Sequence, residues 1–412
     1  MKLPYVSVDK AFEYFDYLYG ERSPEQELRY KDTFKSFCKY FGVSGGYIAS
    51  SSGRVELLGN HTDHNGGKVL STTISLDTIA FFVSSKGQKI TLYSEGYGEI
   101  IVDLNDYTNN KEATPKGLIS GVLDYFVKNG KKIGGFKAYC NSNVLGGAGI
   151  SSSASFEVLI AEILNFLYND GKVTEEEKAL ASWYSENNFF GKPCGKLDQT
   201  AISFGGVNLL DFSCDNSICV KRVDNNLSSL KLFLINTGGS HENLTDEYAS
   251  IPNEMKKVAS LFGKSKLIEV SENEFLTNLH KVLQNAKDRE VSRAIHFYQE
   301  NARVQKAYEF LNNKDDKGFI DCVNKSGESS VIKLQNCMVN GSSDQPIIKT
   351  LSALSMIEEC LAIRVHGGGF AGCVLAVVEK AKSNVFSEKA KKIFGEKFVI
   401  ELNVRSVGAI TL

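Results

Sequence analysis

Clustered glycines constrain this chain more than any other feature of its sequence. Of its 412 residues, 36 are glycine, and 14 of these lie in four short stretches. Glycine adopts backbone angles that other residues avoid, and it lets backbone N–H groups approach a ligand closely. Tight turns with special backbone geometry are therefore expected at residues 59–67, 146–149, 191–206 and 367–372.

Composition narrows the class of protein. The chain has 47 Lys and Arg against 49 Asp and Glu, with 42% hydrophobic and 23% charged residues, as in an ordinary folded protein. Its length predicts two large domains or three small ones. Because there is no surplus of basic residues, we expect no nucleic acid partner.

The sequence also argues against a membrane protein or a secreted protein. Its longest apolar runs, at 78–83 and 373–378, hold six residues each, whereas a membrane-spanning helix needs about 20. Charges and aromatic rings come early, so no signal peptide is predicted. The nine cysteines show no CxxC pair and no zinc spacing, and we expect reduced thiols. A cytoplasmic protein without a membrane partner is expected.

Hydrophobic spacing predicts where helices and strands lie. Apolar residues recur three and four positions apart in the first forty residues, which predicts two helices there. Residues 47–58 and 74–83 are rich in β-branched and apolar types, and they predict strands on either side of a turn-rich segment. A helix is expected over 156–167, after a run of serines able to cap it. The other expected elements are strands at 89–102, 134–141, 206–211 and 230–236, and mostly helical segments at 175–187, 251–286 and 292–311.

The stretch Ser52–Gly67, SGRVELLGNHTDHNGG, gathers polar side chains between two predicted strands. It holds an arginine, two histidines, an aspartate and two asparagines, a density that packing does not require. Convergent polar groups on a glycine-bearing loop indicate a binding site. A solvated polar loop is the alternative interpretation of this stretch alone.

The stretch Leu145–Ser155, LGGAGISSSAS, combines glycines with the start of a predicted helix. Backbone N–H groups of such a turn, together with those of the helix N-terminus, favour polyphosphate as the ligand. The stretch is not a Walker A loop, because no GK[ST] follows the glycines. A turn that only caps the helix is the alternative.

The stretch Glu186–Gln199, ENNFFGKPCGKLDQ, places two carboxylates, Glu186 and Asp198, around a glycine turn. Near a phosphate loop, two carboxylates can divide the roles of metal ligand and general base. Without that context, a solvated aspartate is the simpler interpretation. The last stretch, His366–Gly372 or HGGGFAG, is typical of a structural turn when taken alone.

In combination and in this order, the four stretches resemble the motifs of galactokinases in the GHMP kinase superfamily. GRVELLGNHTDHNGG is similar to the galactokinase signature GRVNLIGEHTDYNGG, and LGGAGISSSAS is similar to the family phosphate loop. GKPCGKLDQ resembles the CGIMDQ segment, and VHGGGFAGC resembles the third family motif, (M/V)(T/H)GGGFGGC. The resemblance extends from about Ile48 to the C-terminus.

The resemblance implies the two-domain α+β fold of GHMP kinases, with the active site in the interdomain cleft. A ribosomal-protein-S5-like domain is expected over residues 1–205, and a ferredoxin-like domain over residues 206–412. The second domain is expected to pack HGGGFAG toward the phosphate loop, with His366 in a structural role.

The resemblance further implies that the γ-phosphoryl group of ATP is transferred to the anomeric hydroxyl of a sugar, with Mg²⁺ as cofactor. Asp198 matches the catalytic base, and Arg54 matches the arginine that keeps this aspartate ionised and stabilises the phosphoryl group in transfer. Ser153 and Glu186 match the ligands of Mg²⁺. The residues expected to bind the triphosphate are Gly147, Gly149, Ser151, Ser152 and Ser153.

Four residues match family positions that contact the sugar, and the resemblance implies the same role here: His61, Asp63, Gly195 and Tyr248. Tyr248 ends HENLTDEY, which resembles the family stretch HxLxxxEY with a shifted Leu. The clear departure is Asn60, also expected at the sugar, where galactokinases have a glutamate that accepts a hydrogen bond from the C6 hydroxyl. The amide removes a negative charge and adds a donor, so it weakens the preference for a C6 hydroxyl.

Two further departures concern the surroundings of the site. The stretch Gly327–Asn336, GESSVIKLQN, differs from the family stretch SLRDDYEVS. The tryptophan of the family adenine pocket is absent, because the single tryptophan is Trp183, which lies in the predicted helix before Glu186 and is expected in the core.

The expected activity is therefore ATP-dependent 1-phosphorylation of D-galactose or a close relative, by a monomer or weak homodimer. The change at Asn60 leaves galacturonate, N-acetylgalactosamine and L-arabinose open as substrates. A sensor that binds sugar and ATP without turnover is an alternative from another class. Sensors of this kind lack the Ser-Ala pair that this chain has at Ser153 and Ala154, which favours an enzyme. A mevalonate or homoserine kinase is disfavoured by GNHTDHNGG.

Overall fold

The computed structural model describes residues 7–412 except 148, 193, 215–216, 225–226 and 240–243. Within these residues a large sheet runs in the order β12-β1-β2-β5-β3-β4, with β6 paired to β2 and β7 to β6. β3 and β5 pair in parallel, and the long β1–β2 pair is antiparallel. The strands are β1 (Tyr47–Leu58), β2 (Lys68–Ser84), β3 (Lys89–Ser94), β4 (Gly98–Asp103), β5 (Phe136–Ser142), β6 (Val207–Asp211), β7 (Cys219–Arg222) and β12 (Ile410–Thr411).

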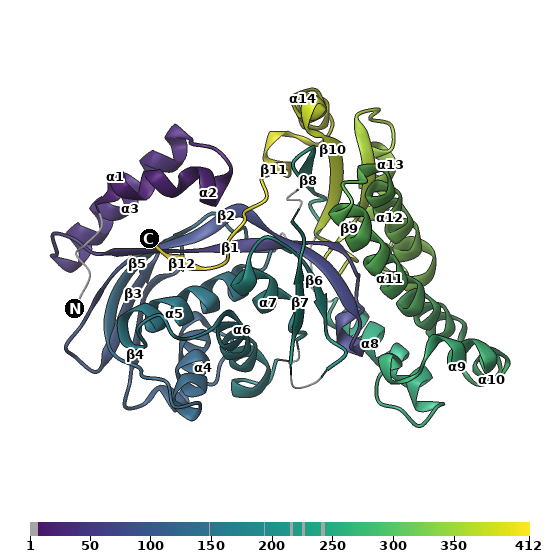
Figure 1. The fold of residues 1–412 in the computed structure, drawn as a ribbon, viewed down its shortest axis with the longest axis horizontal. Helices are drawn as coiled ribbons and strands as arrows, with labels where there is room; N and C mark the ends of the chain where they lie inside the picture. Colours follow the sequence, from purple (N-terminus) through teal and green to yellow (C-terminus); the bar gives the residue numbers. More distant parts are fainter. Residues whose placement is uncertain (1–6, 148, 193, 215–216, 225–226, 240–243) are drawn as a thin grey trace.

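Helices cover both faces of the large sheet (Figure 1). One face carries α1 (Val8–Ala11), α2 (Phe15–Tyr19) and α3 (Pro24–Phe41), and the other carries α4 (Pro115–Lys128), α5 (Ser152–Tyr168), α6 (Glu175–Tyr184) and α7 (Leu197–Phe204). Successive side chains of a strand point to opposite faces. Ile79 and Phe81 therefore pack against the first group of helices, while Ala80 and Phe82 pack against the second. Burial on both faces explains the unbroken apolar run in this strand.

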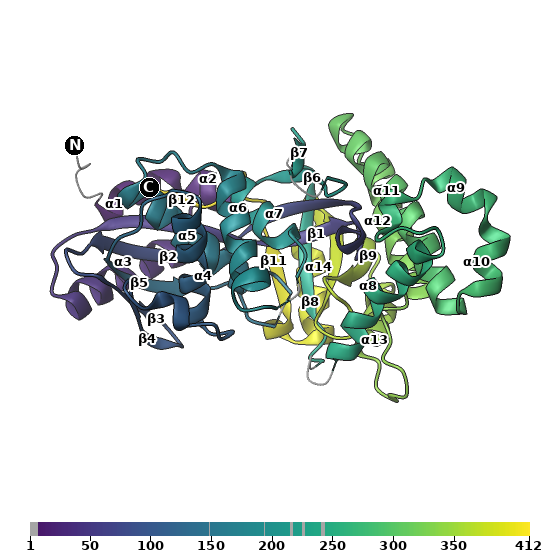
Figure 2. The same cartoon turned by 90° about the horizontal axis from the view of Figure 1, so that it is seen from below.

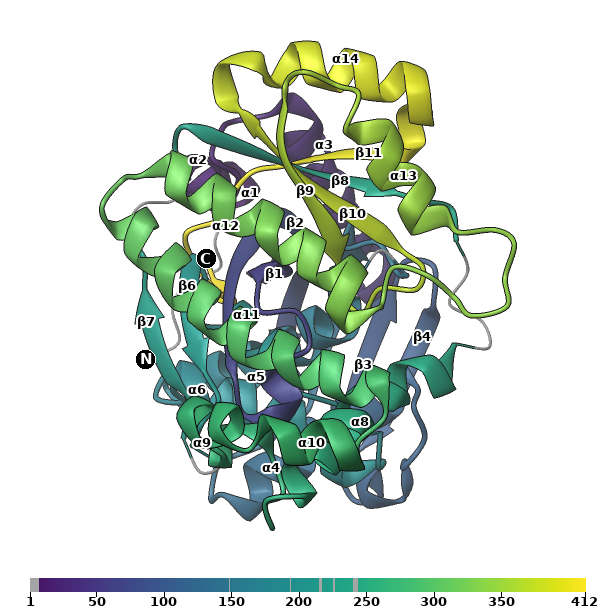
Figure 3. The ribbon, with the colours of Figure 1, turned by 90° about the vertical axis from the view of Figure 1, so that its right-hand side faces the viewer.

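The small sheet runs in the order β11-β8-β10-β9. Its strands are β8 (Leu230–Asn236), β9 (Cys360–His366), β10 (Cys373–Glu379) and β11 (Val399–Leu402). One face packs against α13 (Pro346–Leu354) and α14 (Ser383–Phe394). Figure 3 shows these two helices above α11 (Asp288–Asn312) and α12 (Asp316–Ser329), which lie side by side.

The remaining helices extend the second half of the chain away from the sheets. They are α8 (Thr245–Ser260), α9 (Glu272–Thr277) and α10 (Leu279–Asn285). Figure 2 shows α9 and α10 at one end of the long axis of the molecule. None of the described helices combines the length and apolar character needed to cross a membrane.

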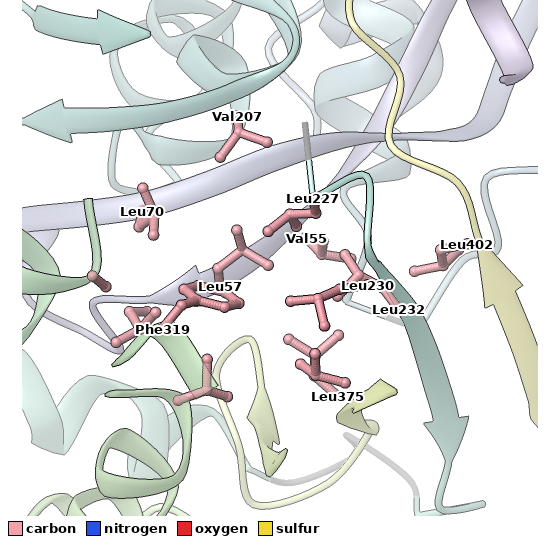
Figure 4. Close-up of a cluster of buried hydrophobic side chains, with 14 of the residues drawn as sticks. Val55, Leu57, Leu70, Val207, Leu227, Leu230, Leu232, Phe319, Leu375 and Leu402 are labelled. Atoms are coloured by element: carbon pink, nitrogen blue, oxygen red, sulfur yellow. The ribbon is translucent and has the colours of Figure 1, made fainter. Parts of the chain in front are cut away.

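The two sheets share one hydrophobic core (Figure 4). Val55 and Leu57 of β1 belong to the same buried cluster as Leu232 of β8 and Leu375 of β10. The glycine loop before α5 and the turn after β9 are thereby brought to the same side of the molecule. The chain also returns to the large sheet through β6, β7 and β12, which follow the expected boundary at residue 205. The division into residues 1–205 and 206–412 stays a prediction.

Most predicted elements are confirmed, with three differences. The segment 89–102, expected as a strand, forms two antiparallel strands, β3 and β4, with a turn at residues 95–97 between them. β2 begins at Lys68 and not near residue 74, because Ser71 and Thr72 continue the strand and pair with β6. The segment 251–286 is mostly helical but broken, since Gly263 adopts φ +69° after α8.

Candidate active site

A cleft of about 740 Å³ lies between the loop after β1, the start of α7 and the N-terminal part of α8. It brings together residues that are far apart in the sequence. The predicted site residues that line it are Arg54, Asn60, His61, Asp63, Glu186, Gly195, Asp198 and Tyr248. The predicted phosphate-binding residues lie beside the cleft, in the loop that leads into α5 and in the first turn of that helix.

Asp198, in the first turn of α7, is held by two residues. Arg54 donates from Nε and Nη2 to Asp198 Oδ1 at 2.9 and 2.6 Å, and Ser151 Oγ donates to Oδ2 at 2.5 Å. Burial alone would raise the pKa of Asp198, but the Arg54 guanidinium and the Ser151 hydroxyl outweigh it and hold the pKa below its ordinary value. Asp198 is therefore a carboxylate at neutral pH.

The loop before α5 ends in left-handed backbone. Gly147, Gly149 and Ser151 have φ of +76°, +70° and +66°. Ser151 is the N-cap residue, yet its side chain makes no cap hydrogen bond. The predicted serine cap is wrong, because the left-handed conformation places the hydroxyl on Asp198 and not on the helix backbone. Uncapped N–H groups at this helix start are available to an anion.

Arg54 and the turn after β9 also fix the carbonyl of Gly149. Arg54 Nη1 donates to this carbonyl, and His366 Nε2 donates to it at 3.1 Å. The expected packing of HGGGFAG against the phosphate loop is thus confirmed. Burial lowers the pKa of His366 to about 3, so the imidazole is neutral.

The same turn supports the loop after β1, a role that sequence reasoning missed. The carbonyl of Gly368 accepts from His61 Nε2 at 2.9 Å, and the carbonyl of Gly369 accepts from the Tyr248 hydroxyl at 2.9 Å. Residues 241–243 of the HENLTDEY stretch lie outside the described residues. The glycine turn therefore orients two of the predicted sugar-binding residues.

His61 presents an unsatisfied ring nitrogen. Its Nδ1 is buried and has no hydrogen-bond partner among the described residues. Burial lowers the pKa of His61 to about 3, with the neighbouring His64 adding to the effect. Because Nε2 donates to Gly368, Nδ1 of the neutral ring is an unsatisfied acceptor enclosed by its surroundings.

Asp63 and Gly195 meet so closely that residue 195 has no room for a side chain. A Cβ atom on Gly195 would overlap Asp63 Oδ2. The Asp63 carboxylate also lies 3.7 Å from His64 Nε2. The glycine in the loop before α7 thus allows a carboxylate from the loop after β1 to reach across the cleft.

Asn60 is saturated with internal hydrogen bonds. Its Nδ2 donates to Glu56 Oε1 at 3.0 Å and to the Gly367 carbonyl at 2.7 Å. Its Oδ1 accepts from Asn336 Nδ2 at 2.8 Å and from Ser330 Oγ at 3.4 Å. An amide has two N–H donors and two lone pairs, so none is left over. The expectation that Asn60 adds a donor to the site is wrong for this reason.

Glu186 lies in a π-helical turn, Ser185–Phe189, that follows α6. Its Oε1 is 3.0 Å from Lys192 Nζ. Behind it, the Glu157 carboxylate of α5 is fully buried without a hydrogen-bond partner among the described residues. Burial, and then the charge of Glu186, raises the pKa of Glu157 well above its ordinary value, so Glu157 is neutral.

Trp183 corrects the expectation of a core residue. It is half-buried and lines the cleft. Its Nε1 donates to the Cys194 carbonyl at 3.1 Å, and Lys196 Nζ lies 4.8 Å from the centre of its ring. Trp183 therefore anchors the loop that carries Gly195.

A second layer of polar residues lies under the loop after β1, and no sequence motif indicated it. His296 of α11 donates from Nε2 to the Asn60 carbonyl at 3.0 Å. Glu300 of α11 accepts from the Gly59 N–H at 2.9 Å, and Ser326 of α12 donates to the same carboxylate at 2.6 Å. The four-residue spacing of His296 and Glu300, which places both on one helix face, was the available signal.

Comparisons with known proteins agree with this architecture. Residues 35–83 match a family model described as galactokinase galactose-binding signature, and residues 117–206 match the GHMP kinases N terminal domain. The galactokinase of Clostridium tetani is 32% identical over 377 residues, covering 88% of this chain and 93% of the relative. The galactokinase of Pyrococcus furiosus is 31% identical over 352 residues, covering 84% and 93%.

Solved structures give the same fold. Lactococcus lactis galactokinase complexed with galactose superimposes with a TM-score of 0.80 at 24% identity, covering 93% of this chain and 99% of that chain. Methanococcus jannaschii mevalonate kinase superimposes with a TM-score of 0.61 at 18% identity, covering 88% and 99%.

The fold is that of a GHMP kinase. Within that class, the sequence relatives and the matched signature show that the chain belongs to the galactokinase family. It is accordingly a sugar kinase that uses ATP.

Proposed function

We propose that this enzyme transfers the γ-phosphoryl group of ATP to the anomeric C1 hydroxyl of D-galactose, giving galactose 1-phosphate and ADP. The observation that carries the proposal is the clamp on Asp198. Arg54 and Ser151 hold this carboxylate where the cleft meets the phosphate loop. D-galactose is chosen as the sugar because the relatives are named galactokinases.

Asp198 acts as the general base. It accepts the proton of the C1 hydroxyl as that oxygen attacks the γ-phosphorus. Arg54 keeps the carboxylate ionised, since the two share a 2.6 Å ion pair. Its positive charge also stabilises the negative charge on the phosphoryl group during transfer. Gly147, Gly149, Ser151, Ser152 and Ser153 bind the triphosphate through the helix start and its hydroxyls.

Mg²⁺ fits the residues beside this loop. Glu186 offers a carboxylate in the cleft wall and Ser153 a hydroxyl in the first turn of α5, both oxygen donors of the kind Mg²⁺ prefers. Among the described residues no group of three or more His, Cys, Asp or Glu could hold a metal by itself, which suits an ion shared with phosphate oxygens and water. When bound, Mg²⁺ neutralises charge on the β- and γ-phosphates.

The sugar is held by the loop after β1 and its neighbours. The Asp63 carboxylate accepts hydrogen bonds from ring hydroxyls, and the missing side chain at Gly195 lets this carboxylate reach across the cleft. His61, which lines the same part of the cleft, contacts the sugar beside Asp63. Tyr248, fixed through its hydroxyl to Gly369, forms part of the opposite wall. These contacts orient C1 toward Asp198 and thereby reduce the entropic barrier to transfer.

The test is an ADP-release assay with Mg·ATP on D-galactose, N-acetylgalactosamine, galacturonate and L-arabinose, with mass spectrometry of the products. We expect turnover of D-galactose to a 1-phosphate. Asp198→Asn should lower kcat by about 10²–10⁴-fold while ATP affinity is retained. Wild-type enzyme that binds galactose without releasing ADP would instead identify a sensor.

A matched control separates loss of the base from loss of the fold. Asp170 is also an aspartate, lies just after the C-terminal end of α5 and has a side chain that is 83% exposed. Asp170→Asn should leave kcat unchanged. If Asp198→Asn kept more than about a tenth of the wild-type kcat, Asp198 would not be the base.

A further inference from the structure

Glu56, near the end of β1, and Asn60, in the loop after it, have exchanged their residue types relative to the galactokinase signature. The signature GRVNLIGEHTDYNGG has asparagine where this chain has Glu56 and glutamate where it has Asn60. The two side chains touch, because Asn60 Nδ2 donates to Glu56 Oε1 at 3.0 Å. This chain and the signature therefore each have one carboxylate and one amide at these two positions. The carboxylate is at position 56 in this chain and at position 60 in the signature.

The carboxylate of Glu56 is the member of this pair that still has acceptor capacity. Glu56 lines the cleft and is 4% exposed. Its Oε1 accepts from Asn60 and from Arg364 Nη2 at 2.7 Å. Its Oε2 accepts no hydrogen bond from any residue that the structure describes. This oxygen is also not fully enclosed by protein atoms. Oε2 is thus available to a ligand hydroxyl.

Arg364 stabilises the buried carboxylate of Glu56 on β1. The Arg364 side chain is fully buried in β9, and its Nη1 donates to the Leu57 carbonyl at 2.7 Å. Burial raises the pKa of Glu56, and the adjacent guanidinium opposes that rise. A buried cation of this kind needs an anionic partner, which Glu56 provides.

Further sequence departures contact the same pair. Ser330 and Asn336 come from the stretch GESSVIKLQN, and both donate to Asn60 Oδ1. They hold the amide plane so that its Nδ2 faces Glu56. The changes at 56, 60, 330 and 336 therefore form one connected group.

We propose that Glu56, and not residue 60, supplies the carboxylate that accepts the C6 hydroxyl of the sugar, with Asn60 as a positioning residue. This inference rests on the proposed function, since it assigns a hydroxyl of the proposed substrate. The negative charge missing at residue 60 lies on β1 within hydrogen-bonding distance of it. A sugar with a C6 carboxylate, such as galacturonate, is repelled.

The test compares D-galactose with 6-deoxy-D-galactose, which lacks the C6 hydroxyl. The measured quantity is the ratio of kcat/KM for the two sugars, in wild type and in Glu56→Gln. A site that hydrogen-bonds a hydroxyl rejects the analogue without it. We expect the ratio to fall by about tenfold or more in Glu56→Gln. A purely structural role beside Arg364 would lower both kcat/KM values equally, and an unchanged ratio would overturn the proposal.

The exchange variant Glu56→Asn with Asn60→Glu restores the order of the family signature. Its ratio should return to within about threefold of the wild-type value. A matched control is Glu162→Gln, because Glu162 is also a buried carboxylate, paired with Lys178 at 3.0 Å, and does not line the cleft. This control should leave the ratio unchanged. Should the exchange variant fail to fold, the ratio in Glu56→Gln decides the question.

The outcomes separate this inference from the proposed function. If wild type phosphorylates D-galactose and Glu56→Gln leaves the ratio unchanged, the function stands and the inference fails. If wild type phosphorylates neither sugar, the function fails, and calorimetry on the same sugars tests the inference. Glu56→Gln should then weaken binding of D-galactose and not of 6-deoxy-D-galactose. Turnover of galacturonate by wild type, or equal wild-type affinity for both sugars, would overturn the inference.

Discussion

At the scale of single residues, Ser151 tunes the acidity of Asp198. Its hydroxyl donates to Oδ2 at 2.5 Å and is among the groups that lower the pKa of Asp198. A base whose pKa is lowered stays active until the pH falls through that low pKa. Ser151→Ala removes one lowering contribution, so the pKa rises and the acidic limb of kcat/KM moves to higher pH.

The measurement is the pH profile of kcat/KM for the sugar in wild type and Ser151→Ala. His61 and His366, with pKa values of about 3, stay neutral across the neutral range and do not produce a limb there. Ser182→Ala, a serine substitution in α6, serves as the control, because its hydroxyl bonds only the Lys178 carbonyl among the described residues. An acidic limb that stays in place in Ser151→Ala would contradict the assignment.

The sequence predicted the residues that face the cleft better than those that hold them. Arg54 and Asp198 are 144 positions apart, yet each lies in a motif, and the structure joins them. Asn60 lines the cleft, and its place at the sugar stays a prediction. The donor expected of it is engaged internally, and its partners Ser330 and Asn336 lie in a stretch without a recognisable pattern. Hydrogen-bond saturation depends on contacts between distant segments, which residue spacing does not reveal.

At the scale of elements, the loop before α7 and the loop after β1 fit together through one glycine. Gly195→Ala should displace Asp63, because the added Cβ would overlap its carboxylate. We expect kcat/KM for the sugar to fall by about 10²-fold, as a displacement of about 1 Å produces, while the KM for ATP changes little. Steady-state kinetics with each substrate varied in turn measures this.

The control for this prediction is Gly87→Ala, in the turn between β2 and β3. A Cβ there meets only Ser85 Oγ at 3.7 Å, an ordinary contact, and the backbone is not left-handed. Kinetics should be unchanged in this variant. Equal losses for sugar and ATP in Gly195→Ala would indicate general disruption and contradict a local effect on Asp63.

Helices and strands were predicted correctly where the pattern of apolar residues along the segment favoured one type of secondary structure. β1 was predicted over 47–58 as observed, because apolar residues at both ends of the segment favour a strand, and the structure buries every residue of it. α12, α13 and α14 were not predicted, although each buries one face on the small sheet or beside it. Their apolar stripes are short and interrupted by polar residues, so tertiary packing decides their structure more than local pattern does.

At the scale of the whole molecule, the shared core couples the two halves of the active site. The cleft needs the loop after β1 from the large sheet and the glycine turn after β9 from the small sheet. Leu375 of β10 is fully buried in the cluster that also contains Val55 and Leu57 of β1. Packing between the sheets therefore sets the positions of the residues that meet in the cleft.

Leu375→Ala tests this coupling. The deletion should cost about 2–5 kcal/mol of unfolding free energy. Trp183, the single tryptophan, lies in α6 under the large sheet and reports on the half of the molecule that does not contain Leu375. If the halves unfold together, the urea midpoints from tryptophan fluorescence and from far-ultraviolet circular dichroism fall together. Leu276→Ala, the same deletion at a 57% exposed leucine, should move neither midpoint. A fluorescence midpoint that stays at its wild-type value in Leu375→Ala would mean that the large sheet keeps its structure without the small one, and that the shared cluster does not transmit stability between them.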